Sequence, residues 1–561
     1  MDRKIGVYIC ECGPNIAEKV DIDKVIEAVS PLENVAVVER YKLLCSGDGK
    51  KFLGEQIKKH SLTHVVVAAC SPREHQQTFM EVCENAGINP YLFQLANIRE
   101  QCAWITEDKE QATTKAIRIV KAAIGRIRCH IPLEKKQIEC NPDVLIVGGG
   151  LAGIEASLLL ASPDRKVYLV EKTSSLGGLT NNFEKTFPDM QPCSTLMKQK
   201  IEQVNKNESI EIFTESEVEE ILGFFGNFEV NVEKKTEEKT IVHLDVGAVI
   251  LATGSTLFNP QGSPLYGYGK FDNVITALEF EKMNISGKIA LKNGRTPTSA
   301  AIIHCVGRED KGYCSEICCM YSIKFVRYLK EKIPNIKVSN LYSDLCIPGK
   351  SHQQFYEQTQ GKHVDFIRAE IVGINRKGEQ LDITYKDEKG GKKNLAVDMV
   401  ILSPALEPTS DTFRLAELTR ISAGDEGFFT EEHEKLGPVS TSTEGVYIAG
   451  CSQGPKSISD TITQSEAVTG KILSSLIPGK KIEPEVKVAC ISEAFCIGCK
   501  TCLNVCSYGV ITFDETKKIS VVNEVICRGC GNCVAACPSG AVTLKHFTYN
   551  QIYQELKEAA Q

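Results

Sequence analysis

The chain has 561 residues, 42% of them hydrophobic, and carries 65 basic and 72 acidic side chains for a formal net charge of −7. At about 150 residues per domain this length predicts three or four domains, and the slight negative charge does not fit the basic surface of a nucleic-acid-binding protein. No run of about 20 uncharged apolar residues is present to span a membrane. The start "MDRKIGVYIC" has an acid at position 2 and an apolar run that is too short for a secretory signal peptide.

The 24 cysteines are the exceptional feature of the composition. Disulfide frameworks belong mainly to small secreted domains, whereas a large chain without a secretory signal is expected to keep its thiols reduced in the cytoplasm. Because most of these cysteines stand at the spacing of metal ligands, the sequence predicts metal binding.

The first part of the chain alternates apolar runs with charged, amphipathic stretches. The runs "KIGVYIC", "VAVVE", "HVVVAAC" and "YLFQLAN" predict the strands of a small doubly wound α/β domain over residues 1–130, followed by a linker at 131–142. Cysteines follow the carboxyl ends of these strands, which is the edge at which open α/β sheets bind ligands.

The cysteines at this edge predict a metal centre. We expect a [4Fe–4S] cluster bound by Cys10, Cys12, Cys45 and Cys70, with Cys102 as the reserve ligand. Two other interpretations remain open. The thiols could be buried and structural, or "CSGDGKK" could form a phosphate-binding turn, although that stretch lacks the full P-loop pattern.

The stretch "PDVLIVGGGLAGIEASLLLA" opens a predicted FAD-binding domain over residues 143–482. An apolar strand leads into a glycine-rich turn, and a helix follows. The glycines of this turn are Gly148, Gly149, Gly150 and Gly153. Glycines let the backbone approach a pyrophosphate, and the helix N-terminus supplies free N–H groups. The next strand, "KVYLVEK", ends in Glu171, which is placed to accept a hydrogen bond from an adenosine ribose.

Two later stretches favour FAD over NAD, because they resemble flavoproteins of the thioredoxin reductase type. "VGAVILATGS" has the buried strand and A-T-G turn of that class, and "GVYIAGCSQGPKSISDTITQSEAVTGKIL" has the strand and helix that close on the isoalloxazine. In such flavoproteins the strand usually ends in A-G-D, whereas here Cys451 takes the position of the acid. A solvated helix-start lysine is the alternative for Lys456. The further FAD-binding residues that we expect are Lys172, Gly178, Thr253, Gly254, Gly450, Gln453, Gly454, Pro455 and Lys456.

Residues 290–400 stand where such a flavoprotein would bind a pyridine nucleotide. The strand "AAIIHCVG" lacks a G-x-G-x-x-G turn and leads directly into four cysteines, so a nicotinamide phosphate has no cradle there. These cysteines predict a further [4Fe–4S] site, and scattered buried cysteines or a redox disulfide are the alternatives. The predicted ligands are Cys305, Cys314, Cys318 and Cys319.

The C-terminal residues 483–561 predict an α+β ferredoxin domain with two [4Fe–4S] clusters. "CIGCKTCLNVCS" and "CRGCGNCVAACPSGA" both follow C-x2-C-x2-C-x3-C, and the fourth cysteine of each run binds the other cluster. The expected ligand sets are Cys496, Cys499, Cys502 and Cys537 for one cluster, and Cys527, Cys530, Cys533 and Cys506 for the other. Ser507 replaces the proline that usually follows the first run, which removes no ligand.

Eight cysteines remain without a predicted ligand role. Cys193 could lie near the flavin, but ordinary packing is the favoured interpretation, and Cys490 is interpreted as structural because it precedes the ferredoxin spacing. The eight are Cys83, Cys102, Cys129, Cys140, Cys193, Cys346, Cys451 and Cys490.

Several stretches together resemble the A subunits of heterodisulfide reductases. They are "CVGREDKGYCSEICCMYSIK", "GGLTNNFEKTFPD", "AGCSQGPKSISDT" and "ACPSGAVTLKHFTYNQI", and the resemblance extends over nearly the whole chain. It implies a FAD-containing iron–sulfur oxidoreductase subunit of an anaerobic complex and supports the N-terminal cluster. Methanogen members often carry a further two-cluster ferredoxin within the flavin domain, whereas the corresponding stretch here, "VEKKTEEKTIVHLDVGAVILATG", contains no cysteine.

The same resemblance implies FAD-based electron bifurcation or confurcation between a two-electron donor, ferredoxin and a second acceptor on a partner subunit. The expected partners are heterodisulfide reductase B- and C-like subunits, ferredoxin, and a hydrogenase, formate or NADH dehydrogenase module, with a homodimer inside the larger complex. No catalytic side chain is predicted, since the terminal substrate chemistry is expected on partner subunits.

Two alternative functions stay open. The first is a non-bifurcating subunit that feeds a quinone-, sulfur- or CoA-thioester-linked oxidoreductase. The second is a dithiol NAD(P)H reductase, but the missing second glycine loop and the absence of C-x-x-C beside the flavin weigh against it.

Overall fold

The computed structural model describes residues 3–235 and 239–560, which form two compact units of mixed α/β structure. Unit 1 combines the residues up to 138 with those from 483 onward, and unit 2 comprises Glu139–Ile482. The two ends of the sequence therefore build one body, and the flavoprotein-like middle builds the other. Among the described residues, no helix is both long and apolar enough to cross a bilayer.

The N-terminal part of unit 1 is a four-stranded parallel sheet with the order β2-β1-β3-β4. Its central strands β1 and β3 are buried along their whole length, as expected for a parallel sheet that is covered on both faces. One face packs against α1 and α4, and the other packs against α2 and α3. The elements are β1 (Ile5–Cys10), α1 (Ile22–Val29), β2 (Val35–Tyr41), α2 (Gly47–Lys59), β3 (His64–Ala69), α3 (Pro72–Asn85), β4 (Phe93–Asn97), η2 (Arg99–Ala103) and α4 (Lys109–Ile127).

Unit 2 begins with a five-stranded parallel sheet of the order β22-β11-β5-β6-β7. Strand β22 comes from far along the chain and pairs with β11, so the last part of unit 2 closes the first sheet. Helices α5, α6 and α12 pack against this sheet. The elements are β5 (Val144–Val147), α5 (Leu151–Leu160), β6 (Val167–Val170), α6 (Cys193–Lys206), β7 (Ile210–Phe213), β11 (Ala248–Leu251), β22 (Val446–Ile448) and α12 (Ile458–Ser475).

A second five-stranded parallel sheet follows in unit 2, with the order β13-β20-β14-β15-β16. Strand β14 leads through α8 into α9, which carries the adjacent pair Cys318 and Cys319 at its N-terminus. The elements are β13 (Val274–Thr276), α7 (Ala277–Ile285), β14 (Ser299–Val306), α8 (Arg308–Lys311), α9 (Cys318–Lys332), β15 (Lys337–Tyr342), α10 (His352–Thr359), β16 (Val364–Arg368), β20 (Met399–Pro404) and α11 (Thr412–Thr419).

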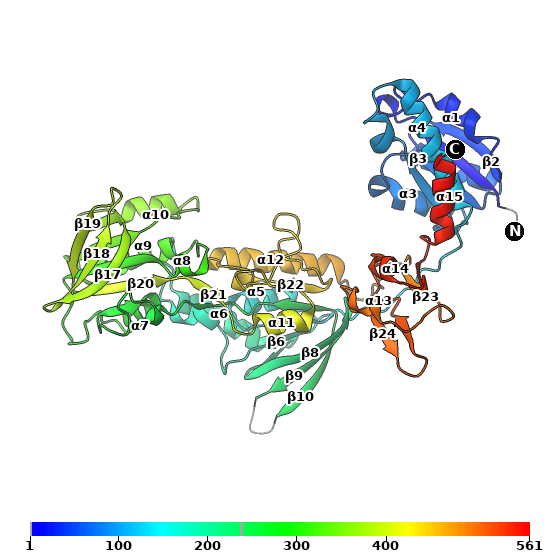
Figure 1. Cartoon of the computed structure of the whole chain (residues 1–561). Coiled ribbons are helices and arrows are strands. Elements are labelled where there is room, and N and C mark those ends of the chain that lie inside the picture. The colour runs from blue at the N-terminus through cyan, green and yellow to red at the C-terminus, as the bar shows by residue number, and fades with distance from the viewer. Residues whose placement is uncertain (1–2, 236–238, 561) are drawn as a thin grey trace. The chain divides into compact units, whose positions relative to one another are not determined.

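Smaller antiparallel sheets complete unit 2. The cysteine-free stretch noted in the sequence contributes to the hairpin of β9 and β10 (Figure 1); its residues 236–238 lie outside the described part of the chain. The strands are β8 (Ser216–Phe224), β9 (Asn227–Lys234) and β10 (Thr240–Val246); β12 (Ser255–Leu257) with β21 (Leu406–Pro408); and β17 (Glu370–Lys377), β18 (Gln380–Lys386) and β19 (Lys392–Val397).

The C-terminal part of unit 1 consists of two short antiparallel strand pairs, two short helices and a final helix. The elements are β23 (Ala489–Ile491), α13 (Thr501–Asn504), β24 (Ile511–Asp514), β25 (Ile519–Val522), α14 (Asn532–Ala536), β26 (Val542–Leu544) and α15 (Tyr549–Ala560). In Figure 1 the final helix α15 lies along α4 of the N-terminal sheet.

Complementary groups hold α15 against α4. Arg126 pairs with Glu555 at 2.7 Å, and Arg128 pairs with Glu558 at 3.1 Å. A Cβ at Gly125 would lie 2.5 Å from the Glu558 side chain, so a glycine is needed for the close approach of the two helices. The tail is therefore an integral part of the N-terminal domain.

Two histidines are buried where the tail meets the N-terminal domain. The rings of His130 and His546 stack with their centroids 4.3 Å apart. Each ring uses one nitrogen to donate to a backbone carbonyl, at 3.1 Å to Tyr91 and at 2.7 Å to Ile131. The other nitrogens, His130 Nε2 and His546 Nδ1, are buried and have no hydrogen-bond partner among the described residues. Both rings are therefore held in the neutral form.

We predict that the stability of unit 1 falls in mild acid. Burial first, and then the neighbouring His546, lower the pKa of His130 to about 3, and burial also lowers the pKa of His546, beside the charges of Arg126 and Lys487. Unfolded histidines bind protons near pH 6.5, so the contribution of His130 is complete above that pH and falls by about 1 kcal/mol per pH unit below it, and the contribution of His546 falls in the same direction.

Urea unfolding at about pH 7.5 and about pH 5.5 measures this loss. The variant His130→Phe keeps a stacked ring but cannot take up a proton, so its stability should change less between the two pH values than that of the wild type. An equal pH dependence in both proteins would contradict the prediction.

Candidate functional site

Unit 2 contains a cavity of about 380 Å³ at the carboxyl ends of the first sheet. This volume lies within the range of small-molecule and cofactor sites. Its wall includes eight of the fourteen residues that the sequence predicts for FAD: Gly148, Gly150, Glu171, Lys172, Gly178, Thr253, Gly254 and Lys456. The cavity is thus formed by the predicted glycine turn and by distant segments together.

The glycines of the first turn are required by close backbone packing. Gly148 has φ +115°, and a Cβ there would lie 2.3 Å from the carbonyl oxygen of Ala252 on the neighbouring strand. A Cβ at Gly153 would lie 2.0 Å from the carbonyl oxygen of Gly148, which brings α5 tightly against the turn. The N-terminus of α5 therefore faces the cavity without side chains in between, as a pyrophosphate site requires.

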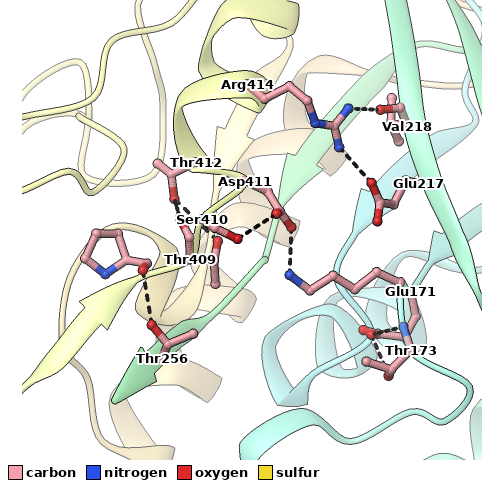
Figure 2. Close-up of polar contacts among 12 residues, drawn as sticks. Glu171, Thr173, Glu217, Val218, Thr256, Thr409, Ser410, Asp411, Thr412 and Arg414 are labelled. Carbon is pink, nitrogen blue, oxygen red and sulfur yellow. Dashed lines mark hydrogen bonds and ion pairs between the residues drawn. The ribbon is translucent and has the colours of Figure 1, made fainter. Parts of the chain in front are cut away.

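Glu171 organises the same turn. Its carboxylate accepts hydrogen bonds from the Gly149 backbone N–H at 2.7 Å and from the Thr173 N–H and hydroxyl at 2.8 and 2.7 Å; Figure 2 shows the contacts with Thr173. Gly149 thus does not line the cavity itself but fixes the acid that does. The position of Glu171 fits the ribose-binding role that the sequence predicts.

The opposite wall comes from a segment without any sequence motif. Lys172 donates to Asp411 at 2.7 Å, and Arg414 donates to the carbonyl oxygen of Val218 at 2.6 Å and to Glu217 at 3.4 Å (Figure 2). Although burial opposes it, the hydrogen bond from Lys172 lowers the pKa of Asp411. Asp411 and Arg414 could not be predicted from the sequence, because they follow β21 and carry no motif, and the pairing of β21 with β12 brings their segment to the cavity.

One polar atom of the cavity lacks a partner. Thr253 Oγ1 is buried and makes no hydrogen bond within the described residues. A buried hydroxyl in this state costs free energy unless a ligand satisfies it. This observation fits a bound cofactor with polar groups at the A-T-G turn.

The returning segment contributes less than expected. Cys451 and Lys456 line the cavity, and the Cys451 thiol donates to the Lys456 carbonyl oxygen at 3.6 Å. Burial raises the pKa of Cys451 and lowers that of Lys456. Gln453 instead donates to the carbonyl oxygen of Pro438 and contacts Gln464. The predicted residues outside the cavity wall are Gly149, Gly153, Gly450, Gln453, Gly454 and Pro455.

A second, smaller cavity in unit 2 is lined by Cys305, Cys314 and Cys318, together with Arg308 and Tyr313. Cys305 has φ +58° at an irregularity in the pairing of β14, an uncommon conformation for a residue with a side chain. The strand end thereby turns a sulfur toward the residues that precede α9.

Cys319 lies beside this cavity rather than in its wall. Its sulfur accepts a hydrogen bond from the Cys346 backbone N–H at 3.3 Å, and a hydrogen bond from Cys318 lowers its pKa. The Cys346 thiol is close enough to Cys314 and Cys319 for their charges to raise its pKa, after burial as the main cause. No spacing signal in the sequence points to Cys346, because it stands 27 residues after Cys319.

At the edge of the N-terminal sheet, the structure gathers the four predicted ligands Cys10, Cys12, Cys45 and Cys70. Burial raises the pKa of Cys10, and the nearby Cys12 and Cys45 raise it further. Burial also raises the pKa of Cys70 to about 11, with a smaller contribution from Cys10. The reserve ligand Cys102 lies apart in the core on the α1 and α4 face, where its thiol donates to the Ala112 carbonyl oxygen at 3.0 Å.

Arg99 and a helix start complete this edge. Arg99 Nη1 donates to Cys12 Sγ at 3.9 Å. The stretch "CSGDGKK" forms the capped start of α2, in which the Ser46 hydroxyl accepts from the Gly49 N–H at 3.1 Å.

The C-terminal cysteines occupy the ferredoxin part of unit 1. Cys506, Cys527, Cys530 and Cys533, the predicted ligands of one cluster, line a common cavity. Of the other set, Cys502 and Cys537 share the surrounding core. Hydrogen bonds with Thr501 lower the pKa of Cys499, and Cys537 is close enough to oppose this shift. Cys506, the fourth cysteine of the first run, thus lies beside the first three cysteines of the second run, as the predicted ligand set requires.

The remaining cysteines have other surroundings. Cys83 is fully buried in the core between the N-terminal sheet and α2 and α3, and Cys193 is fully buried at the start of α6. Cys129 accepts a hydrogen bond from Asn550 at 3.3 Å, and the Cys490 thiol lies 4.0 Å from Glu524. In the described ranges no group of three or more His, Cys, Asp or Glu side chains is arranged around a single metal ion; a cubane needs a wider arrangement, since each sulfur binds a different iron.

Comparison with protein families matches two parts of the chain. Residues 142–464 match the pyridine nucleotide-disulphide oxidoreductase family, which implies FAD, and residues 495–541 match the 4Fe-4S dicluster domain. The solved thioredoxin reductase of Lactococcus lactis covers 60% of this chain and 99% of its own, at 15% identity and a TM-score of 0.42.

Curated relatives match almost the whole length. The A subunit of the H(2):CoB-CoM heterodisulfide,ferredoxin reductase of Methanothermobacter thermautotrophicus is 35% identical over 602 positions, covering 92% of this chain and 91% of the relative. A protein of Archaeoglobus profundus that is named as similar to the heterodisulfide reductase A subunits is 33% identical and covers 92% of this chain. The alignment with the first is longer than this chain, so that relative contains residues that this chain lacks. The resemblance predicted from the sequence is confirmed, and the chain belongs to the A-subunit family of the heterodisulfide reductases, which are oxidoreductases.

Proposed function

We propose that this subunit carries one FAD and four [4Fe–4S] clusters and splits the electron pairs of a two-electron donor between ferredoxin and a second acceptor. One observation carries the proposal: Ile317 lines the flavin cavity, and the next residue, Cys318, lines the cysteine cavity. Adjacent residues thus serve both sites, in the place where a nicotinamide nucleotide would otherwise meet the flavin.

The residues of the large cavity fit FAD. The turn at Gly148–Gly153 and the start of α5 would hold the pyrophosphate, Glu171 the ribose, and Thr253 a polar group of the cofactor. Lys456 would support the ring. Bound FAD would supply the chemistry of accepting electrons in pairs and releasing them singly, while the chain positions it and keeps water out.

The four sets of cysteines fit four clusters, and the observations that support each cluster differ. The set Cys506, Cys527, Cys530 and Cys533 shares a cavity, which supports one ferredoxin cluster directly, and Cys496, Cys499, Cys502 and Cys537 would bind the second. The gathering of Cys10, Cys12, Cys45 and Cys70 supports the N-terminal cluster. Cys305, Cys314, Cys318 and Cys319 would bind the cluster next to the flavin. Because these thiols must lose protons to bind iron, cluster assembly would release protons.

The names of the relatives support the partners that we propose. They pair the reduction of the CoB-CoM heterodisulfide with ferredoxin, and one relative from Methanococcus maripaludis is named for both H2 and formate. We therefore place this subunit in a complex with heterodisulfide reductase B- and C-like subunits, ferredoxin, and a hydrogenase, formate or NADH dehydrogenase module.

The unpartnered threonine gives the first test of FAD binding. Thr253→Val removes the hydroxyl that we assign to the cofactor, so FAD affinity should fall by about tenfold, the value of one net hydrogen bond. Thr469→Val is the matched control, because the Thr469 hydroxyl is equally buried and unpartnered within the described residues but does not line the cavity. Fluorescence titration of the flavin-free protein measures both affinities, and equal losses in the two variants would argue against this role of Thr253.

Iron analysis tests the N-terminal cluster. The anaerobically purified chain should hold about sixteen iron atoms, and Cys70→Ala should lose about four of them. Cys102→Ala should keep the full content, since that thiol points into a different core. Unchanged iron in Cys70→Ala, with the loss appearing in Cys102→Ala, would reverse the assignment.

Cys318→Ala tests the electron-splitting function itself. The variant should lose about four iron atoms and the ability to reduce added two-cluster ferredoxin, while it retains FAD, whose predicted contacts lie elsewhere. Flavin content, iron content and the bleaching of ferredoxin are measured on the same preparations. Full ferredoxin reduction by the variant would show that the cysteine cavity is not on the electron route.

A further inference from the structure

A buried ion pair joins helix α9 to the segment that lines the flavin cavity. Lys324 of α9 and Glu281 of α7 are 2.5 Å apart, and their side chains are only 4% and 3% exposed. Taking two charges out of water is costly unless each charge is matched by close and well-directed partners. The remaining hydrogen bonds of the pair therefore identify which parts of the fold it holds together.

These hydrogen bonds go to two consecutive residues. Lys324 Nζ also donates to the Lys185 carbonyl oxygen at 2.8 Å, and the second carboxylate oxygen of Glu281 accepts from the Glu184 backbone N–H at 3.1 Å. The preceding residue, Phe183, lines the flavin cavity. Both charges thus act on the backbone of one short segment at the cavity wall.

Aromatic rings complete the environment of the lysine. Its Nζ lies 5.4 Å from the ring centroid of Tyr328, 5.6 Å from that of Phe325 and 5.7 Å from that of Phe183. Ring faces at this distance attract a cation, and more strongly where water is excluded. The Tyr328 hydroxyl also accepts from the Lys185 backbone N–H at 2.9 Å, so α9 contacts the segment with a second side chain.

The start of helix α9 contributes residues to the walls of both cavities. Ile317, just before the helix, lines the flavin cavity, and Cys318 lines the cysteine cavity, whereas Lys324 lies less than two turns further along. A rigid helix that is tied to residues 183–185 cannot shift its first turn relative to the flavin. We propose that Lys324 and Glu281 are positioning residues that fix the separation of the flavin from the neighbouring cluster; this inference rests on the proposed function.

The choice of charges rather than apolar side chains fits this role. Apolar contacts are non-directional and allow neighbouring segments to slide, whereas this pair is satisfied only when α7, α9 and residues 183–185 meet in one arrangement. Packed apolar residues in the same place would cost less to bury. The pair therefore gives up some stability and gains a single geometry.

Lys324→Met tests the proposal, with Lys330→Met as the matched control. Lys330 lies on the same helix but donates to the Ile336 carbonyl oxygen at 2.6 Å, away from residues 183–185. In the loaded full-length protein, hydrogen–deuterium exchange should become faster at residues 183–187 and at the start of α9 in Lys324→Met alone, because the Lys185 carbonyl oxygen loses its donor and the segment thereby loses one of its contacts with α9.

Laser-flash reduction with a deazaflavin donor measures the effect on electron transfer. The equilibration between flavin and cluster absorbance should be slower in Lys324→Met than in the wild type and in Lys330→Met, since electron transfer slows as the separation of two redox centres grows. If Lys324→Met fails to fold, Lys324→Met with Glu281→Gln removes both charges and leaves an acceptor for the Glu184 N–H. The same slowing is expected in this double variant.

Wild-type exchange and equilibration rates in a variant with full FAD and iron would overturn the proposal. Failure of the proposed function has a different signature: Cys318→Ala would then lose no iron, whatever the exchange pattern of Lys324→Met. Slower equilibration together with faster exchange, confined to the Lys324 variants, would support the positioning role.

Discussion

The burial of cysteine sulfurs, which must lose their protons to bind iron, is the constraint that both units of this protein share. Of the sixteen cysteines predicted to bind iron, only Cys499 and Cys530 are exposed. Burial raises the pKa of Cys70 and Cys533 to about 11, so these thiols stay protonated unless iron takes the place of the proton. The fold therefore has to offset, at each site, the cost of burying a deprotonated sulfur.

Backbone N–H groups give part of that compensation. The N–H groups of Glu316, Cys346 and Ala489 donate to the sulfurs of Cys314, Cys319 and Cys527 at 3.4, 3.3 and 3.5 Å. Hydrogen bonds to cluster sulfurs and the charge nearby are the main means by which a protein sets the reduction potential of a cluster. The predicted cluster sites thus differ in their donors as well as in their burial.

The sequence allowed most of the local features to be predicted, because their signals are short. The four N-terminal strands, the glycine turn with Glu171 and the ferredoxin spacings each depend on residues close together in the chain. The wall at Asp411 and Arg414, the approach of Cys346 to Cys319, and the packing of α15 on α4 depend on contacts between distant segments. The ion pair of Lys324 and Glu281 was missed for the same reason, since a lone lysine on an apolar helix carries no spacing signal.

The discontinuity of unit 1 has a consequence for the order in which the protein is made. During synthesis the N-terminal sheet leaves the ribosome before unit 2, whereas α15, which covers α4, follows unit 2 in the sequence. All of unit 2 is translated in between and can fold as a body of its own, because domains generally fold as units. Until α15 emerges, α4 exposes Gly125, Arg126 and Arg128 without the partners that α15 supplies, so the N-terminal body is completed only after unit 2 has been translated.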